Sequence, residues 1–74
     1  MNKEQERRSL IESNISFGKS VKEFHKEVIN LIGSKGEWNE TDLKVINYAA
    51  RQVGKIDGFI ERNRLKLEDG IWKQ

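Results

Sequence analysis

The chain has 74 residues, no cysteine and one histidine, which excludes a disulfide framework and argues against a zinc site built on thiolates or several histidines. Lys and Arg number 14 against 12 Asp and Glu, so the formal net charge of +2 allows a nucleic-acid partner without demanding one. The apolar runs are far shorter than the roughly 20 residues of a membrane span, and no apolar segment follows the charged N-terminus as in a signal peptide. We therefore expect a single cytoplasmic domain without membrane contact.

The first expected helix, at about residues 3–12, consists mainly of charged residues. Glu4 and Glu12 each stand four residues from Arg8, a spacing that supports a helix by ion pairing. Leu10 and Ile11 are its apolar residues. With so little apolar surface, this segment is either a separate short helix or a frayed extension of the next one.

The second expected helix, at about residues 17–32, has the clearest apolar pattern in the chain. Its apolar residues alternate in steps of four and three, which places them along one face of a helix. Gly33 follows in the position of a left-handed C-cap. His25 stands at the edge of the apolar face, where a boundary residue is more typical than a general base. The residues that we expect to face the next helix are Phe17, Val21, Phe24, Val28 and Leu31.

The third expected helix, at about residues 40–64, begins with a capping signal. Asn39 can cap the helix, and Asp42 follows three residues later, as in a capping box. In the remaining tail, residues 65–74, the pair Asp69 and Gly70 permits either a small hairpin or a turn that packs the tail on the helices. The apolar face of this helix consists of Ile46, Ala49, Val53, Ile56 and Ile60.

These segments predict an all-α fold, either a small helical hairpin or a three-helix arrangement, with a short C-terminal tail. About six residues join the second and third helices, and so short a connection makes two helices pack antiparallel. A core of this size supplies only about 3–5 kcal/mol. We therefore expect self-association or docking on a larger partner.

Catalysis finds little support in the sequence. The hydroxyl side chains that could act as nucleophiles are not paired with a base at any recognisable spacing. The glycines at 33 and 36 lack the spacing and the preceding strand of a phosphate-binding loop. We expect a protein that is not an enzyme and that uses neither a cofactor nor a metal ion.

Three small residues form a ridge along the third helix, because Ala50, Gly54 and Gly58 are spaced four residues apart. Each glycine costs a helix about 1 kcal/mol relative to alanine, so either the ridge has a role or both glycines are tolerated accidents. One role is an interface that another backbone approaches closely. The other is a break at Gly54, which gives a helix-turn-helix unit with Arg62 near the DNA phosphates. Asp57 argues against the second role, since it places an acid on the reading helix.

An aromatic and cationic strip lies on the side of the third helix away from its main apolar face. Tyr and Arg are enriched in binding hot spots, and such a strip can also stack on a nucleotide or a single-stranded nucleic acid. The alternative is that the tail or the N-terminal segment covers the aromatic rings. With Trp72 from the tail, the candidate binding residues are Tyr48, Arg51, Lys55, Phe59 and Arg62.

The sequence favours a small regulator or inhibitor that acts by binding a protein partner and that self-associates. A helix-turn-helix DNA-binding regulator is the alternative, with nucleic acid as the less favoured partner. A third hypothesis is a helical oligomer that sequesters a small nucleotide near Arg51 and Lys55. The short length and the Lys, Asn and Ile content are typical of phage or plasmid accessory proteins.

Overall fold

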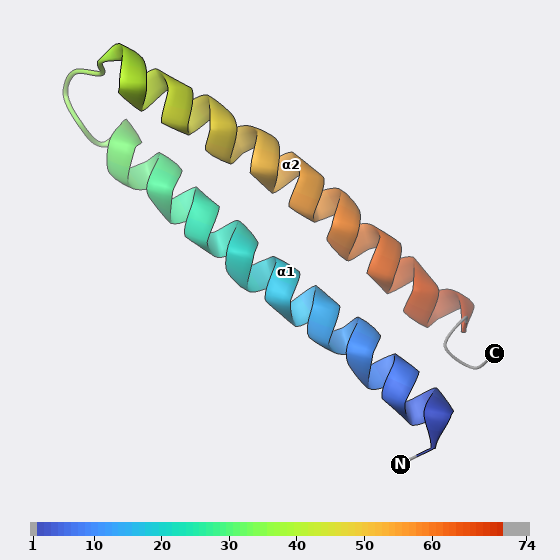
Figure 1. The fold of residues 1–74 in the computed structure, drawn as a ribbon. Coiled ribbons are helices and arrows are strands. Elements are labelled where there is room, and N and C mark those ends of the chain that lie inside the picture. Colours follow the sequence, from blue (N-terminus) through green and yellow to red (C-terminus); the bar gives the residue numbers. More distant parts are fainter. Residues whose placement is uncertain (1, 71–74) are drawn as a thin grey trace.

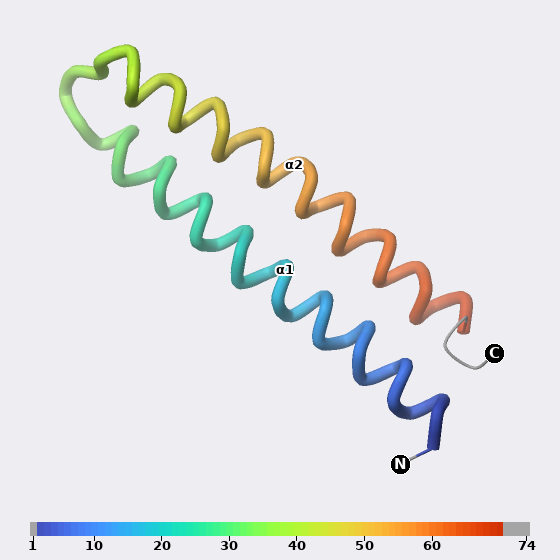
Figure 2. Tube along the Cα trace, in the orientation of Figure 1, coloured from blue at the N-terminus to red at the C-terminus, as the bar shows by residue number. Residues whose placement is uncertain are grey.

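The computed structural model describes residues 2–70, which form two long helices joined by a short loop. Helix α1 spans Lys3–Gly33 and helix α2 spans Glu40–Asp69. The helices run antiparallel and side by side, so the start of α1 and the end of α2 lie opposite the loop (Figure 1; Figure 2 shows the same path as a tube). The molecule measures 54 × 18 × 15 Å. The all-α prediction is confirmed, whereas residues 2–70 do not form a three-helix arrangement.

Helix α1 unites the segments 3–12 and 17–32, so the first segment is an extension of the second and not a separate helix. The Asn2 side chain accepts a hydrogen bond from the Gln5 N–H at 2.8 Å and caps the first turn. Glu4 and Glu6 lie in that turn, where the helix dipole favours negative charge. No proline interrupts the helix, and the polar residues at 13–16 are therefore accommodated without a break.

The end of α1 differs from the prediction, because Gly33 is not a left-handed cap. The C-cap is Ser34 with a φ of −81°, and its N–H donates to the Asn30 carbonyl oxygen at 3.0 Å. The Trp38 indole N–H then donates to the Ile32 carbonyl oxygen at 2.8 Å. A side chain from the loop thus satisfies one of the last carbonyl groups of the helix.

Helix α2 begins with the predicted capping box. The Asn39 side chain accepts from the Asp42 N–H at 2.8 Å, and the Asp42 carboxylate accepts from the Asn39 N–H at 3.1 Å. Lys35 donates to the same carboxylate at 2.8 Å. The hydrogen bond from Lys35, followed by that from Asn39, holds the pKa of Asp42 below its ordinary value.

Helix α2 continues past the predicted end at residue 64, so the tail is helical as far as Asp69. Gly70 then adopts the left-handed conformation with a φ of 69° and caps the helix, so the small hairpin at Asp69 and Gly70 is wrong. The rest of the tail, including Trp72, lies outside the described residues. The backbone is helical through Gly54, so the turn that a helix-turn-helix unit requires is missing.

The face of α2 that packs on α1 is the predicted one. Ala49 is only 2% exposed and is among the most buried residues of the described chain. The other four members of the predicted face, Ile46, Val53, Ile56 and Ile60, are half-buried.

The predicted face of α1 is only partly correct. Val21 and Val28 are half-buried, but Phe17, Phe24 and Leu31 are exposed. Two paired helices share one narrow seam, which holds two columns of residues from each helix. Val21 and Val28 belong to one of these columns, but the other column is not that of Phe17, Phe24 and Leu31. Three of the seam residues of α1 are not apolar side chains: Asn14 is polar, Gly18 has no side chain and His25 can titrate. The seam residues of α1 are Ile11, Asn14, Gly18, Val21, His25, Val28 and Ile32.

A buried amide pair lies inside the seam. The Asn14 amide N–H donates to the Asn63 side-chain oxygen at 3.3 Å, and Asn63 donates in turn to the Phe59 carbonyl oxygen at 2.8 Å. Asn63 is 3% exposed, and a shift of one helix along the other would leave its side-chain oxygen without the hydrogen bond from Asn14. Polar seam residues of this kind specify register. Three pairs define the register here: Asn14 with Asn63, Gly18 with Ile60, and Lys22 with Asp57.

Candidate functional site

Four large apolar side chains form a column on α1 at intervals of seven residues. Seven residues are almost two full turns of an α-helix, so the column follows one side of the helix. Each member directly precedes a seam residue and therefore lies beside the seam. The exposed fractions are 62% for Leu10, 69% for Phe17, 63% for Phe24 and 71% for Leu31. Their regular spacing on one side of the helix differs from the singly scattered apolar residues of an ordinary surface.

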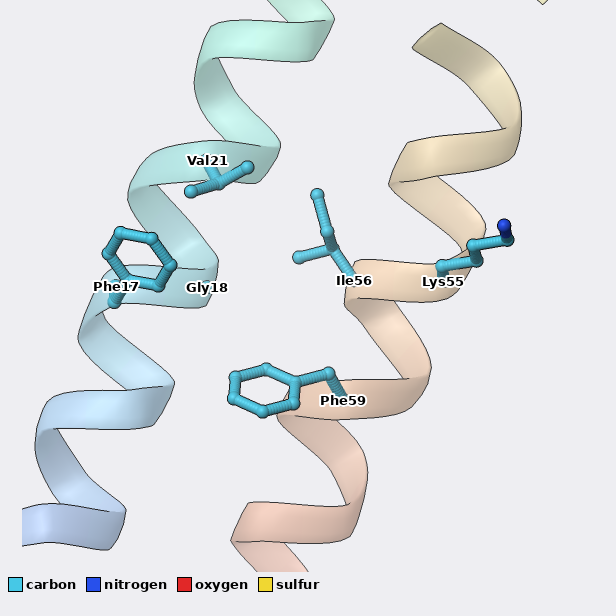
Figure 3. Close-up of a pocket in the computed structure, with 6 residues that line it drawn as sticks. All are labelled: Phe17, Gly18, Val21, Lys55, Ile56 and Phe59. Carbon is cyan, nitrogen blue, oxygen red and sulfur yellow. The ribbon is translucent and has the colours of Figure 1, made fainter. Parts of the chain in front are cut away.

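The column borders a groove of about 300 Å³ between the two helices (Figure 3). The Ile56 and Phe59 side chains point toward α1, whereas Lys55 points away from it. Gly18 brings no side chain to the groove, and a Cβ atom there would lie 2.8 Å from the Ile60 Cγ1 atom. The close approach of the helices at this point therefore depends on glycine. The groove is lined by Phe17, Gly18, Val21, Lys55, Ile56 and Phe59.

Helix α2 adds two more exposed apolar residues on the side of the groove. Val45 stands two seven-residue intervals before Phe59, and Tyr48 stands one interval before Lys55. Val45 is 37% exposed and Tyr48 is 56% exposed. We call this side of the hairpin the apolar flank, made of Leu10, Phe17, Phe24, Leu31, Val45, Tyr48 and Phe59.

The opposite side of the seam carries ion pairs. The Lys22 ammonium group lies 2.6 Å from an Asp57 carboxylate oxygen and links the two helices. Arg8 and Arg64 lie on the same side, since seven-residue steps separate Arg8 from Lys22 and Arg64 from Asp57. Arg8 pairs with Glu12 at 2.8 Å, and Arg64 pairs with Glu61 at 2.7 Å. We call this side the charged flank, made of Arg8, Glu12, Lys22, Asp57, Glu61 and Arg64.

The structure brings some of the predicted binding residues together. Phe59 and Lys55 line the groove, and Tyr48 lies on the same flank. Arg51 and Arg62 are exposed, but neither lines the groove. Within residues 2–70, no ion pair forms at Arg51, Lys55 or Arg62. Trp72, the sixth predicted binding residue, lies outside the described residues.

The predicted ridge of small residues lies on the outside of α2. Ala50 and Gly54 are exposed, and a Cβ atom at Gly54 would meet nothing within 4 Å. Gly58 is half-buried, and a Cβ atom there would lie 3.2 Å from an Arg62 guanidinium nitrogen. None of the three residues lies in the contact between α1 and α2, so their role as an interface stays a prediction.

Sequence reasoning missed three features of this surface. Leu10 was assigned to a weak charged helix and not to the column, although it stands seven residues before Phe17. Asn14, Gly18 and Asn63 were given no role. A test of the whole chain for a seven-residue repeat could have found the column, because its members are equally spaced. The pair of Asn14 and Asn63 gives no periodic signal, because its two members lie on different helices.

Other kinds of site find no support in the described residues. His25 lies half-buried in the seam, and its Nδ1 donates to the Val21 carbonyl oxygen at 2.8 Å. Residues 2–70 contain no group of three or more side chains that could hold a metal ion, and neither helix is long and apolar enough to cross a membrane.

Comparison with protein-family models, with curated proteins and with solved structures gives no significant match.

Proposed function

We propose that the protein is a small non-enzymatic regulator or inhibitor that acts by binding another protein chain through its apolar flank. The observation that supports this is the column of Leu10, Phe17, Phe24 and Leu31. Burial of apolar surface contributes about 25 cal/mol per Å². Bulky side chains spaced at seven residues offer that gain to a partner helix along most of the length of α1.

The composition of the flank also favours protein as the partner. Aromatic anchors are typical hot spots of protein interfaces, and the flank has three: Phe17, Phe24 and Tyr48 are all more than half exposed. Nucleic acid is a weaker alternative, because the exposed cations Arg51 and Arg62 stand singly and α2 has no turn at Gly54. The groove suits a phosphate poorly, since Lys55 is its one cation among the six lining residues.

Photo-crosslinking tests the proposal in the cells that make the protein. A photo-reactive amino acid replaces Phe24 on the apolar flank or, as the matched control, Lys19, an exposed residue on the same helix away from that flank. We expect a discrete protein adduct from position 24 and little from position 19. The proposal fails if position 24 gives no adduct, or if both positions give the same adducts in the same amounts.

A further inference from the structure

We propose that the partner of the apolar flank is a second copy of this chain, and that two hairpins form a four-helix bundle with both loops at the same end. This rests on the proposed function, because it names the occupant of the same surface. The flank would become the centre of the bundle, and the charged flanks would face water on both sides.

The hairpin alone buries few apolar residues, and the exposed apolar area of the flank is about the area that a dimer interface needs. Among the described residues only Ile11 and Ala49 are buried hydrophobic ones, and no large side chain is fully buried. A large aromatic side chain carries about 150–250 Å², so the seven side chains of the flank expose on the order of 700 Å² together. Stable dimers bury about 800 Å² per partner. Two copies together would thus obtain the core that one lacks.

The charges beside the flank are complementary to those of a second copy. On the outer edge of α1 the exposed residue beside Leu31 and Phe24 is Glu27, while the outer edge of α2 carries Arg51 and Lys55. The register of the seam places Glu27 at about the height of Arg51 on the neighbouring helix. A two-fold axis parallel to the helices lays α1 of one copy over α2 of the other at equal height. Glu27 then lies at about the height of Arg51 of the second copy and about one helical turn from its Lys55.

Two hairpins can place their apolar flanks face to face about a two-fold axis that is either parallel or perpendicular to the helices. The charges also decide between these two arrangements. A two-fold axis perpendicular to the helices would lay α2 on α2 and bring the cationic edges with Lys55 and Arg62 together, which costs binding energy. The parallel axis avoids this contact and makes every neighbouring pair of helices antiparallel, as in an up-and-down bundle. Charge complementarity therefore selects the arrangement with both loops at one end.

Small residues on the same edge allow close contact. Ser13 and Ser20 alternate with the bulky members of the column and are both exposed. Two-fold symmetry brings Phe17 of one copy opposite Phe59 of the other, above the groove that Gly18 leaves open. Bulky side chains that pack over small ones are the arrangement that close helix packing requires.

Sedimentation equilibrium over a concentration series tests the dimer. The wild-type chain of 8.7 kDa should sediment at twice that mass. The double variant Phe17→Ser, Phe24→Ser should raise the dissociation constant of the dimer by at least about 100-fold, since it removes two central aromatic anchors. The matched control Lys19→Ser, Lys26→Ser, also on α1 but away from the flank, should leave the dissociation constant unchanged. A dimer that persists in the Phe17→Ser, Phe24→Ser variant would contradict the proposal.

A disulfide test addresses the arrangement without depending on the stability of the serine variant. The chain has no cysteine, so Glu27→Cys and Tyr48→Cys can be made singly, mixed and oxidised. These positions lie on opposite outer edges of one hairpin, but next to each other in the proposed bundle. We expect the mixed disulfide to exceed both symmetric ones at least about tenfold, in line with the effective concentration of a preformed contact. Equal amounts of all three disulfides would overturn the arrangement.

The outcomes separate this inference from the proposed function. A wild-type chain that is monomeric at every concentration overturns the second copy as the occupant. If position 24 then still crosslinks to a different protein in cells, the flank remains a protein-binding surface. If neither the dimer nor the crosslink is found, both proposals fail.

Discussion

The two flanks of the hairpin are made by the same two helices and border the same seam, yet one carries ion pairs and the other carries the column of large exposed apolar side chains. The charged flank joins the helices through Lys22 and Asp57 and is lined by ion pairs within each helix. The apolar flank shows Phe17 and Phe24, both more than 60% exposed, and a groove between the helices. A two-helix molecule can bury only the seam, so the residues just beside the seam distinguish a side with charged groups from a side that offers apolar surface.

The difference also shows where stability comes from. Exposed ion pairs contribute only about 0–1 kcal/mol each, so the charged flank contributes little to holding the helices together. Burial of one large apolar side chain contributes about 1.5–3 kcal/mol. The larger reserve of stability therefore lies on the flank that the hairpin leaves open.

The largest expected effect concerns the seam from which both flanks are defined. Gly18→Ala places a methyl group 2.8 Å from the Ile60 Cγ1 atom, so it should destabilise the fold by about 1–3 kcal/mol. Gly54→Ala, the matched control in open space on α2, should instead stabilise it by about 1 kcal/mol. Urea titration of both variants checks the opposite signs. Equal stabilisation by both substitutions would mean that the helices are not in close contact at Gly18.

The amide pair of Asn14 and Asn63 gives an effect of similar size. Asn63→Ala leaves the Asn14 amide part-buried without its partner and should cost about 1–3 kcal/mol. Asn47→Ala, an exposed position on the same helix, should change stability by less than about 0.5 kcal/mol. Thermal melts followed by circular dichroism compare the two variants. If Asn63→Ala has the same melting temperature as Asn47→Ala, the amide pair does not hold the register on which both flanks depend.

A smaller effect is expected on the charged flank. A double-mutant cycle with Lys22→Ala and Asp57→Ala should give a coupling energy of about 0.2–1 kcal/mol, because the pair is partly exposed. Added salt should reduce this coupling. Urea titrations at low and high salt measure it. A coupling above about 2 kcal/mol that is insensitive to salt would show that the charged flank, too, is shielded from water.

The smallest effect lies at the loop end of the seam, at Asp42. Its folded pKa is lowered by Lys35 first and by Asn39 second, so its contribution to stability is complete above its ordinary pKa of 3.8 and is lost as the pH falls through the lower folded value. The wild-type chain should therefore lose stability below about pH 3.8 more steeply than the Asp42→Asn variant. Unfolding midpoints across the acid range compare the two. Parallel curves would show that the capping box and Lys35 do not favour the charged carboxylate.

Much of this fold could be predicted from the sequence, because local signals determine it. The apolar face of α2 and the capping box of Asn39 and Asp42 were predicted correctly, and the short connection predicted the antiparallel pairing. The α1 face was misjudged because the apolar residues Phe17, Phe24 and Leu31 continue the alternating steps of four and three that Val21 and Val28 also follow. In the seam of α1 those positions belong instead to Ile11, Gly18, His25 and Ile32.

The candidate site could be predicted only in part, for the same reason. Tyr48, Lys55 and Phe59 were predicted as neighbours on one helix, since helical spacing alone places them together. Their association with Phe17 depends on the register between the helices. That register is set by the Asn14 and Asn63 pair and by Gly18, and a periodic pattern within one helix does not reveal either.

One fluorescence measurement tests most directly whether a second copy covers the apolar flank while the charged side of α1 stays in water. Trp38 and Trp72 are replaced by Phe, and a single tryptophan is placed at position 24 or, as the control, at position 19. Quenching by acrylamide is then followed as the protein concentration is raised. We expect the tryptophan at position 24 to become protected with increasing concentration, while that at position 19 stays fully quenched. Equal quenching at both positions over the whole concentration range would contradict the account.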